Sequence, residues 1–423
     1  MQTILGNGYD AFIKSLDEHE EKAIFVNNNK ISANKLLSVA NFNLEKIEYE
    51  PNGYYIGKQK LGKHPLHHAG AFYVQDPNAM FTVNAFNFNG NERVLDMCAS
   101  PGGKSIQIAN RIKEGVLVSN EIVKSRCEVL FSNIERMGLK NVIITNDTPA
   151  NISKAYANMF DVCLVDAPCS GEGMFRRGEE YINSWNENLP AMCAVRQLEI
   201  LEEANKCLKE GGHLIYSTCT YSKEENEDVV NKFMLKHSYK LINIQYPHSR
   251  GMDMPEAVRL YPHESRGEGQ FVAVLKKLEE NNLNSTPTIK LQQSKTATEF
   301  IKTFTKNNFN AYVYDRYAYH VADANFVRRG VKLFSIGVRL GESDNKIFKP
   351  CHYLFSAFGR DFLKTFNISH NSSDATKYLH GDTLNLSQPD GYGAVLIDNC
   401  PVGGYKISAQ KFKNLYPKGL RNL

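Results

Sequence analysis

Short apolar runs alternate with amphipathic stretches through the middle of the chain. The runs predict strands at Arg93–Met97, Gly115–Glu121, Asn141–Asn146, Phe160–Ala167 and His213–Cys219. The amphipathic stretches predict helices at about Ser105–Lys113, Val123–Gly138, Ala191–Lys209 and Lys223–Lys236. Strands that alternate with helices are typical of an α/β fold with a parallel, doubly wound sheet. A further apolar run, Phe271–Lys276, predicts a strand that closes an edge of this sheet.

The flanking segments have other patterns. Residues 1–62 predict a small α/β accessory unit, and the catalytic domain is expected over residues 63–278. Residues 279–298 are polar, rich in Asn, Ser, Thr and Gln, and without apolar periodicity, which predicts a linker. Aromatic segments at Tyr312–Tyr319 and Gly393–Ile397 then predict a mainly β or α+β region over residues 299–423.

Composition is that of an ordinary globular protein, with 42% hydrophobic and 23% charged residues. No apolar stretch reaches the length of a membrane span, and the N-terminus lacks the pattern of a secretory signal, so we expect a cytoplasmic protein with no membrane contact. The nine cysteines include no Cys-x-x-Cys pair. In a reducing compartment such cysteines predict buried or catalytic thiols, with no metal site.

Positive charge is concentrated towards the C-terminus. The net charge is +4, but residues 297–423 hold 17 Lys and Arg against 10 Asp and Glu, a balance of +7, which leaves −3 for the remainder. A basic region beside a near-neutral one suggests that the C-terminal region holds a polyanion. A solvated surface that keeps the protein soluble explains the charge equally well.

The first predicted strand ends in a glycine-containing loop, Asp96-Met97-Cys98-Ala99-Ser100-Pro101-Gly102-Gly103-Lys104-Ser105. Ligands of open α/β sheets bind at the carboxyl ends of strands, where glycine lets them approach the backbone. The Gly-Gly-Lys-Ser ending is similar to a phosphate-binding loop, but that motif needs glycine where Cys98 stands, which argues against ATP hydrolysis.

Acidic residues follow the next two strands. Glu121 lies about 20 residues past the glycines, where a carboxylate accepts hydrogen bonds from ribose hydroxyls, and Asp147 follows the third strand. The glycines alone would fit an ordinary strand-to-helix turn. Together with Glu121 and Asp147 they predict an adenosine cofactor without pyrophosphate, S-adenosylmethionine rather than NAD.

Two cysteines and one carboxylate supply the candidate chemistry. Asp166 and Cys169 follow the fourth strand and Cys219 ends the fifth, so both thiols reach one crevice if these strands pair. A thiolate that adds to carbon-6 of cytosine makes carbon-5 nucleophilic towards a methyl sulfonium, after which a base removes the carbon-5 proton and the thiol leaves.

The surroundings of the thiols must support that reaction. An unperturbed thiol is largely protonated near neutrality, so a cation such as Lys104 would help. A protonated Asp166 can donate to the ring nitrogen of the base. Either cysteine alone would be read as structural, and the chemistry does not say which one attacks.

Three segments, Val94–Ser105, Leu164–Gly173 and Tyr216–Asp228, resemble the cofactor, Pro-Cys and Thr-Cys motifs of the RNA cytosine-5 methyltransferases of the Sun/Fmu/nucleolar-protein family. The resemblance implies a Rossmann-like fold, Cys219 as the nucleophile and Cys169 as the thiol that assists release. It implies that Lys104 and Asp166 face the target base as further catalytic residues. The implied S-adenosylmethionine contacts are Cys98, Ala99, Ser100, Pro101, Gly102, Gly103, Lys104, Glu121, Asp147 and Asp166.

Other segments are similar to one branch of this family, the RsmF-type enzymes, which methylate cytidines in the decoding region of small-subunit ribosomal RNA. These segments are His67–Pro77, Arg259–His263 and Tyr416–Arg421. The resemblance covers nearly the whole chain and implies an RNA-binding N-terminal unit, a PUA-like C-terminal region and a monomer that acts on ribosomal RNA or the small subunit. The chain departs from it at Phe25-Val26-Asn27, where an Arg-Val-Asn run is usual, so a contact to the RNA backbone would be missing.

Three further side chains have two interpretations each. Arg176 and Arg177 follow the Pro-Cys loop and are expected to hold phosphates around an extruded base, although surface charge is an equally good explanation. His263 is either a base or a structural residue, and an isolated histidine favours the structural role.

The sequence therefore predicts transfer of a methyl group from S-adenosylmethionine to carbon-5 of a cytidine in 16S ribosomal RNA, through a covalent cysteine adduct and with the base extruded from its stack. Transfer RNA or another RNA is the alternative substrate. A non-catalytic RNA-binding ribosome assembly factor is less consistent with two retained thiols. A DNA methylase is less consistent with the Thr-Cys motif and with the lack of a large recognition insert.

Overall fold

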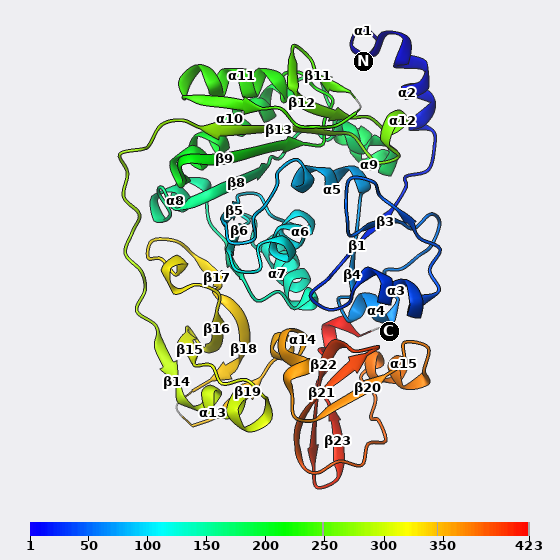
Figure 1. The fold of residues 1–423 in the computed structure, drawn as a ribbon, viewed down its shortest axis with the longest axis vertical. Helices are drawn as coiled ribbons and strands as arrows, with labels where there is room; N and C mark the ends of the chain where they lie inside the picture. The colour runs from blue at the N-terminus through cyan, green and yellow to red at the C-terminus, as the bar shows by residue number, and fades with distance from the viewer. Residues whose placement is uncertain (248, 345, 422–423) are drawn as a thin grey trace.

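The structure, a computed structural model, describes residues 1–247, 249–344 and 346–421. Within these residues the chain forms one ten-stranded sheet, one five-stranded sheet and two four-stranded sheets (Figure 1). No helix within these residues is long and apolar enough to cross a membrane.

The largest sheet has the strand order β11-β12-β13-β9-β8-β5-β6-β7-β17, and β10 also pairs with β13. Its strands are β5 (Arg93–Asp96), β6 (Val116–Asn120), β7 (Val142–Thr145), β8 (Phe160–Asp166), β9 (Leu208–Thr218), β10 (Tyr239–Ile242), β11 (Arg250–Gly251), β12 (Met254–Leu260), β13 (Gln270–Lys277) and β17 (Leu333–Ser335). Strands β5 to β9 pair in parallel, which confirms the predicted Rossmann-like sheet. The prediction that Phe271–Lys276 closes an edge is wrong, because β12 and β10 both pair with β13 outside β9.

Helices cover both faces of the sheet, so its strands are apolar on both sides. They are α5 (Pro77–Asn84), α6 (Gly103–Arg111), α7 (Lys124–Met137), α8 (Pro149–Ala155), α10 (Leu189–Cys207) and α11 (Glu227–Lys236). Successive strand residues enter different cores. Val94 packs in one core with α6 and α7, whereas Leu95 packs in the other with α8, α10 and α11. This two-sided burial fixes the carboxyl ends of the strands, where the candidate site lies.

The N-terminal unit is built on the sheet β2-β3-β1-β4. Its elements are α1 (Gln2–Leu5), α2 (Tyr9–Leu16), β1 (Ala23–Val26), α3 (Ala33–Ala40), β2 (Glu45–Lys46), β3 (Gly53–Tyr55), α4 (Pro65–His68) and β4 (Phe72–Gln75). Because β4 pairs with β1, this unit runs past the expected boundary at residue 62. Phe25, at the position where the resemblance expects arginine, is buried in the core.

The C-terminal region consists of two sheets. The first contains β14 (Gln292–Ser294), β15 (Ala311–Tyr314), β16 (Tyr317–Val321), β18 (Gly337–Ser343) and β19 (Phe348–Pro350). The second contains β20 (Thr365–Ile368), β21 (Gly391–Ile397), β22 (Cys400–Ser408) and β23 (Lys411–Asn414). The helices are α13 (Lys295–Phe304), α14 (His352–Phe358) and α15 (Ser373–His380). The expected linker is shorter than residues 279–298, because Ser294 already caps α13 by accepting a hydrogen bond from the Ala297 amide.

These C-terminal sheets are packed onto the rest of the molecule. Strand β17 extends the central sheet beside β7, and Tyr353 of α14 donates a hydrogen bond to the Leu139 carbonyl beyond α7. The second sheet shares a hydrophobic core with the N-terminal unit, and this core includes Val395 and Ile397 as well as Ile24 and Val26. Figure 1 shows this sheet directly below α3 and α4.

Lys30 joins three parts of the chain at one point. Its ammonium group donates to the carbonyls of Ala69 (2.8 Å), Arg136 (2.9 Å) and Pro401 (2.9 Å), and the residue is only 5% exposed. The three acceptors belong to the N-terminal unit, the end of α7 and β22. A single buried amino group, whose pKa burial lowers to about 7, therefore satisfies carbonyls from the N-terminal, catalytic and C-terminal parts together.

We expect Lys30→Met to lower the free energy of unfolding by about 3 kcal/mol, because buried carbonyls lose their hydrogen-bond donor. The exposed Lys35→Met provides a matched control and should leave stability unchanged. Urea denaturation followed by circular dichroism measures both. Equal stability of the two variants would show that Lys30 does not tie the units together.

Candidate active site

Two cysteine thiols meet at the carboxyl end of the central sheet. Strands β8 and β9 are parallel neighbours, with Asp166 opposite Ser217, so the loops that follow them start side by side. Those loops bring Cys169 Sγ and Cys219 Sγ to 3.2 Å. The condition set by the sequence, that the fourth and fifth strands pair, holds in the structure.

Asp166 lies beside the thiols and is held by two donors. Lys104 Nζ donates to Asp166 Oδ2 and Ser217 Oγ donates to Asp166 Oδ1, each at 2.7 Å. Burial lowers the pKa of Lys104, but the nearby Asp166 outweighs this and raises it, so the ammonium form persists. Both oxygens of Asp166 are therefore engaged by hydrogen-bond partners within the site.

The pKa values of the two thiols are shifted in opposite directions. The hydrogen bond between the two thiols lowers the pKa of Cys219; Lys104 and Arg177 act in the same direction, against burial and Asp166. The same hydrogen bond, together with burial, raises the pKa of Cys169 well above its usual range. Cys219 is therefore the more easily ionised thiol, and its partner stays protonated.

A cavity of about 1590 Å³ opens above these residues. The predicted residues that line it are Cys98, Ala99, Ser100, Pro101, Gly103, Lys104, Glu121, Asp166, Cys169, Arg177 and Cys219. The loop enters α6 through Gly102, whose φ of 111° suits glycine. The volume exceeds that of an ordinary ligand pocket, so it has room for a nucleotide beside a second group.

Two of the predicted cofactor residues lie outside the cavity wall. Gly102 faces α7, where an added Cβ would lie 3.0 Å from Leu130. Asp147 is engaged by neighbouring donors, the Asn151 amide at 2.8 Å and the backbone N–H groups of Thr148 and Lys332 at 2.9 Å. Burial alone would raise the pKa of Asp147, but these bonds lower it. The adjoining Thr148, Pro149 and Ala150 line the cavity instead.

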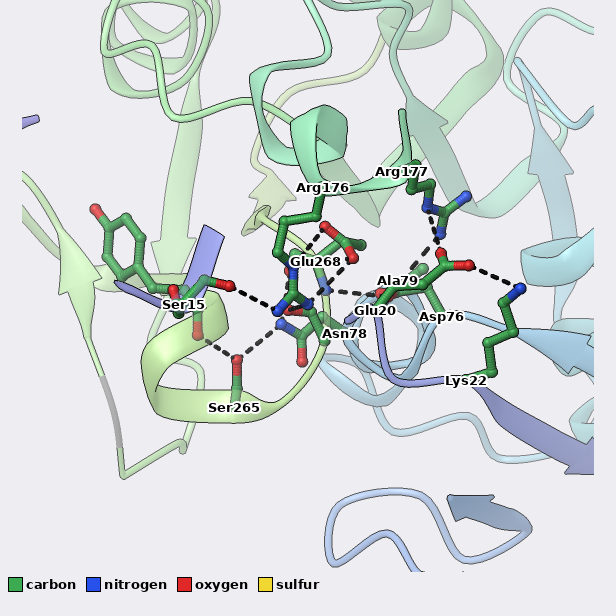
Figure 2. Close-up of polar contacts among 12 residues, drawn as sticks. Ser15, Glu20, Lys22, Asp76, Asn78, Ala79, Arg176, Arg177, Ser265 and Glu268 are labelled. Atoms are coloured by element: carbon green, nitrogen blue, oxygen red, sulfur yellow. Dashed lines mark hydrogen bonds and ion pairs between the residues drawn. The ribbon is translucent and has the colours of Figure 1, made fainter. Parts of the chain in front are cut away.

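The two arginines after the Pro-Cys loop have different environments (Figure 2). The Arg176 side chain is 3% exposed, forms an ion pair with Glu268 at 3.1 Å and donates to the Ser15 carbonyl at 3.2 Å. Contrary to the expectation for Arg176, its guanidinium group is buried, links separate segments of the chain and does not face the cavity. Arg177 lines the cavity and lies 3.6 Å from Glu20 and 3.9 Å from Asp76. Of the pair, only Arg177 lines the cavity.

Several residues at the cavity were not foreseen from the sequence. Glu20, Glu21 and Lys22 reach it from the N-terminal segment, and Tyr181 and Arg196 reach it from α9 (Glu179–Ser184) and α10. Contacts between segments so distant in the chain leave no periodic signal. Asp76 lies within the His67–Pro77 segment, which resemblance had singled out without giving this residue a role.

Two remaining points concern His263 and possible metal ligands. His263, in α12 (Pro262–Ser265), packs edge-on against Phe12 with ring centroids 5.8 Å apart, and it is not among the cavity-lining residues. Burial lowers its pKa, which keeps the ring neutral. Within residues 1–247, 249–344 and 346–421, no cluster of three His, Cys, Asp or Glu side chains could hold a metal ion.

Comparison with known families gives three matches along the chain. Residues 83–276 match the family 16S rRNA methyltransferase RsmB/F. Residues 1–77 match the N-terminal domain of 16S rRNA methyltransferase RsmF, and residues 365–422 match the methyltransferase RsmF PUA domain. The first boundary agrees with the end of β4, and the PUA match is confined to the second C-terminal sheet and its helix.

Individual relatives extend over most of the chain. The ribosomal RNA small subunit methyltransferase F of Enterobacter sp. (strain 638) is 29% identical over 97% of this chain and 92% of its own. The enzyme of the same name from Vibrio vulnificus (strain YJ016) is 34% identical over 64% of this chain and 60% of its own. A methyltransferase homolog protein from Pyrococcus horikoshii has a solved structure that is 27% identical, with a TM-score of 0.57 over 64% of this chain and 92% of that one. From its three matched domains and these relatives, the chain belongs to the RsmB/F methyltransferase family and is of RsmF type.

Proposed function

We propose that this protein transfers a methyl group from S-adenosylmethionine to carbon-5 of a cytidine in 16S ribosomal RNA. The observation that carries the proposal is the thiol pair, Cys169 and Cys219, 3.2 Å apart at the wall of a large cavity. Two adjacent thiols whose pKa values are shifted in opposite directions suit a reaction in which one thiol forms a bond to the base and the other assists the cleavage of that bond.

The residues divide the reaction between them. The Cys219 thiolate adds to carbon-6 of the extruded cytosine, and carbon-5 then takes the methyl group. The Lys104 ammonium pairs with Asp166 and lowers the pKa of Cys219, and so it stabilises the Cys219 thiolate. A base removes the carbon-5 proton, the electron pair of that bond re-forms the carbon-5–carbon-6 double bond, and Cys219 leaves as a thiolate, which the adjacent Cys169 thiol assists by hydrogen bonding.

The cavity suits S-adenosylmethionine at the end next to the glycine loop. Glu121 is almost fully buried, yet lines the cavity, so its carboxylate can accept hydrogen bonds from ribose hydroxyls. Cys98 to Pro101 and Gly103 line the same end. When bound, the cofactor would supply an electrophilic methyl group on a sulfonium, and Lys104 and Asp166 line the same cavity.

The proposed substrate rests on the relatives and on the C-terminal region. The relatives are ribosomal RNA small subunit methyltransferases by name, and the PUA match lies in a region with an excess of positive charge. We propose that the protein acts on ribosomal RNA or on the small subunit as a monomer in the cytoplasm. Transfer RNA or another RNA is the alternative substrate, and bisulfite sequencing of RNA from cells with and without the gene separates them.

Single cysteine variants test the mechanism. We expect Cys219→Ala to abolish methylation and the protein–RNA adduct, because no thiolate adds to carbon-6. We expect Cys169→Ala to accumulate an adduct that survives denaturation, since addition proceeds and release stalls. Gel electrophoresis in denaturant with labelled RNA measures both. An adduct that persists in Cys219→Ala would overturn the assignment, and a wild-type protein that neither methylates RNA nor forms an adduct would favour an assembly factor.

Lys104 should control the ionisation of Cys219. The pKa of Cys219 is lowered, so its alkylation by iodoacetamide should remain fast below the usual midpoint of a thiol and slow only at lower pH, where the thiol is protonated. Lys104→Met removes a cation and should move this midpoint upward. Peptide mass spectrometry measures the rate at each pH. An unchanged midpoint in the variant would remove Lys104 from this role.

Arg177 and Arg176 form a matched pair for RNA binding. We expect Arg177→Gln to weaken RNA binding and to reduce the slope of log K against log salt by about 1, because one phosphate contact is lost. Arg176→Gln should instead lower stability and leave the salt slope unchanged, since Arg176 is paired with Glu268. Fluorescence anisotropy over a salt series measures the slopes. Equal slopes for Arg177→Gln and the wild type would contradict the phosphate role.

A further inference from the structure

Glu225 is a buried carboxylate between the two cysteine loops. It lies in the turn between β9 and α11 and is 0% exposed. Among the described residues, no Lys or Arg forms an ion pair with it. Its oxygens instead accept hydrogen bonds from neutral donors, the Ser170 N–H (2.9 Å), the Ser170 hydroxyl and the Gln197 amide (2.9 Å). Burial of a carboxylate without a neighbouring cation costs desolvation free energy, so this arrangement indicates a specific role for Glu225.

The donors hold the Pro-Cys loop on both sides of Cys169. Ser170 is the next residue in the chain, and the Gln197 amide that reaches Glu225 also donates to the Pro168 carbonyl at 3.0 Å. Gln197 is fixed in turn, because its side-chain oxygen accepts a hydrogen bond from the Tyr216 hydroxyl of β9. One carboxylate therefore sets the backbone position on either side of the Cys169 thiol.

The turn that carries Glu225 also contacts the Thr-Cys loop. The Asn226 amide, next to Glu225, donates to the Thr220 carbonyl at 3.0 Å, and the hydroxyls of Thr220 and Ser170 are 2.9 Å apart. Thr220 follows Cys219 directly. The turn that carries Glu225 is thus joined to the loop of Cys219, while its side chain is joined to the loop of Cys169.

We propose that Glu225 is a positioning residue that fixes the separation of the Cys169 and Cys219 thiols. This inference rests on the proposed function, in which both thiols act on one base. The identity of the residue follows from its donors: three groups converge on it, and only a carboxylate offers acceptors to all of them. Its negative charge adds to the effects of the Cys219 hydrogen bond and burial, which raise the pKa of Cys169.

Glu225→Gln tests the proposal, because it replaces one acceptor oxygen of the carboxylate with an NH2 group. That group would face a hydrogen-bond donor and cannot accept from it. Glu224→Gln is the matched control, since Glu224 is exposed in the same turn. Dibromobimane, which bridges two nearby thiols, reports their separation without RNA or cofactor, and peptide mass spectrometry identifies the bridge. We expect bridging of Cys169 to Cys219 to fall at least several-fold in Glu225→Gln and to match the wild type in Glu224→Gln.

Turnover gives a second readout. We expect the kcat of Glu225→Gln to fall about 100-fold, with the KM for RNA unchanged and the covalent adduct accumulating, because a displaced Cys169 no longer assists release. Normal bridging would overturn the proposal, even if kcat fell. A loss of RNA and cofactor binding with normal bridging would likewise overturn it, since that pattern marks a general structural defect.

A second variant keeps the test decisive if Glu225→Gln does not fold. Gln197→Met removes the amide that links Glu225 to the Pro168 carbonyl, and it should also lower bridging. Normal bridging in a folded Gln197→Met would overturn the proposal. Failure of the proposed function is recognised separately, by an adduct that survives in Cys219→Ala, because the bridging assay does not depend on the reaction.

Discussion

The parallel pairing of β8 with β9 is the constraint on which the site depends. Asp166 and both thiols lie at or just beyond the ends of these two strands, where Asp166 lies opposite Ser217. A register shift of one residue would turn Ser217 away from Asp166 and separate the loops that carry the thiols. Apolar residues that are buried on both faces of the sheet fix that register, so the chemistry is tied to the packing of the core.

Charged residues in this molecule are used in two distinct ways. Arg176 and Lys30 are buried and satisfied by groups of distant segments, so they hold parts of the chain together. Lys104 and Arg177 face the cavity, and both lower the pKa of Cys219. A count of basic residues does not separate these uses. The burial and the partners of each side chain decide whether its charge is available to a substrate.

The sequence predicted the central part of the fold well, because its strands and helices have strong apolar patterns. The strands of the parallel sheet lie within a few residues of their predicted positions, and the two cysteines converge as their places at the ends of β8 and β9 suggested. The outer strands β10 and β11 were missed because they are short and only partly buried, and β12 was missed because Pro255, Glu256 and Arg259 interrupt its apolar residues. The division of the C-terminal region into two sheets was also missed, because aromatic runs mark strands but not their partners.

The site was predicted less evenly. The cofactor loop apart from Gly102, together with Glu121, Asp166 and the thiols, lines one cavity, whereas Asp147 turns to its own loop and to Lys332. Arg176 and Arg177 are adjacent and chemically identical, so the sequence had no means to tell them apart. The difference arises from Glu268 and Ser15, which are brought to Arg176 only by the folded chain.

Strand β17 carries a consequence for the evolution and engineering of this chain. It comes from beyond the catalytic domain, yet it covers the free side of β7, and the adjacent Lys332 backbone binds Asp147. A catalytic fragment that stops after β13 would expose the unpaired backbone of β7, and exposed edges of this kind recruit strands from other molecules and aggregate. The C-terminal region therefore cannot be removed without exposing an edge of the central sheet. Its exchange between homologues would require a replacement region that also supplies a compatible edge strand.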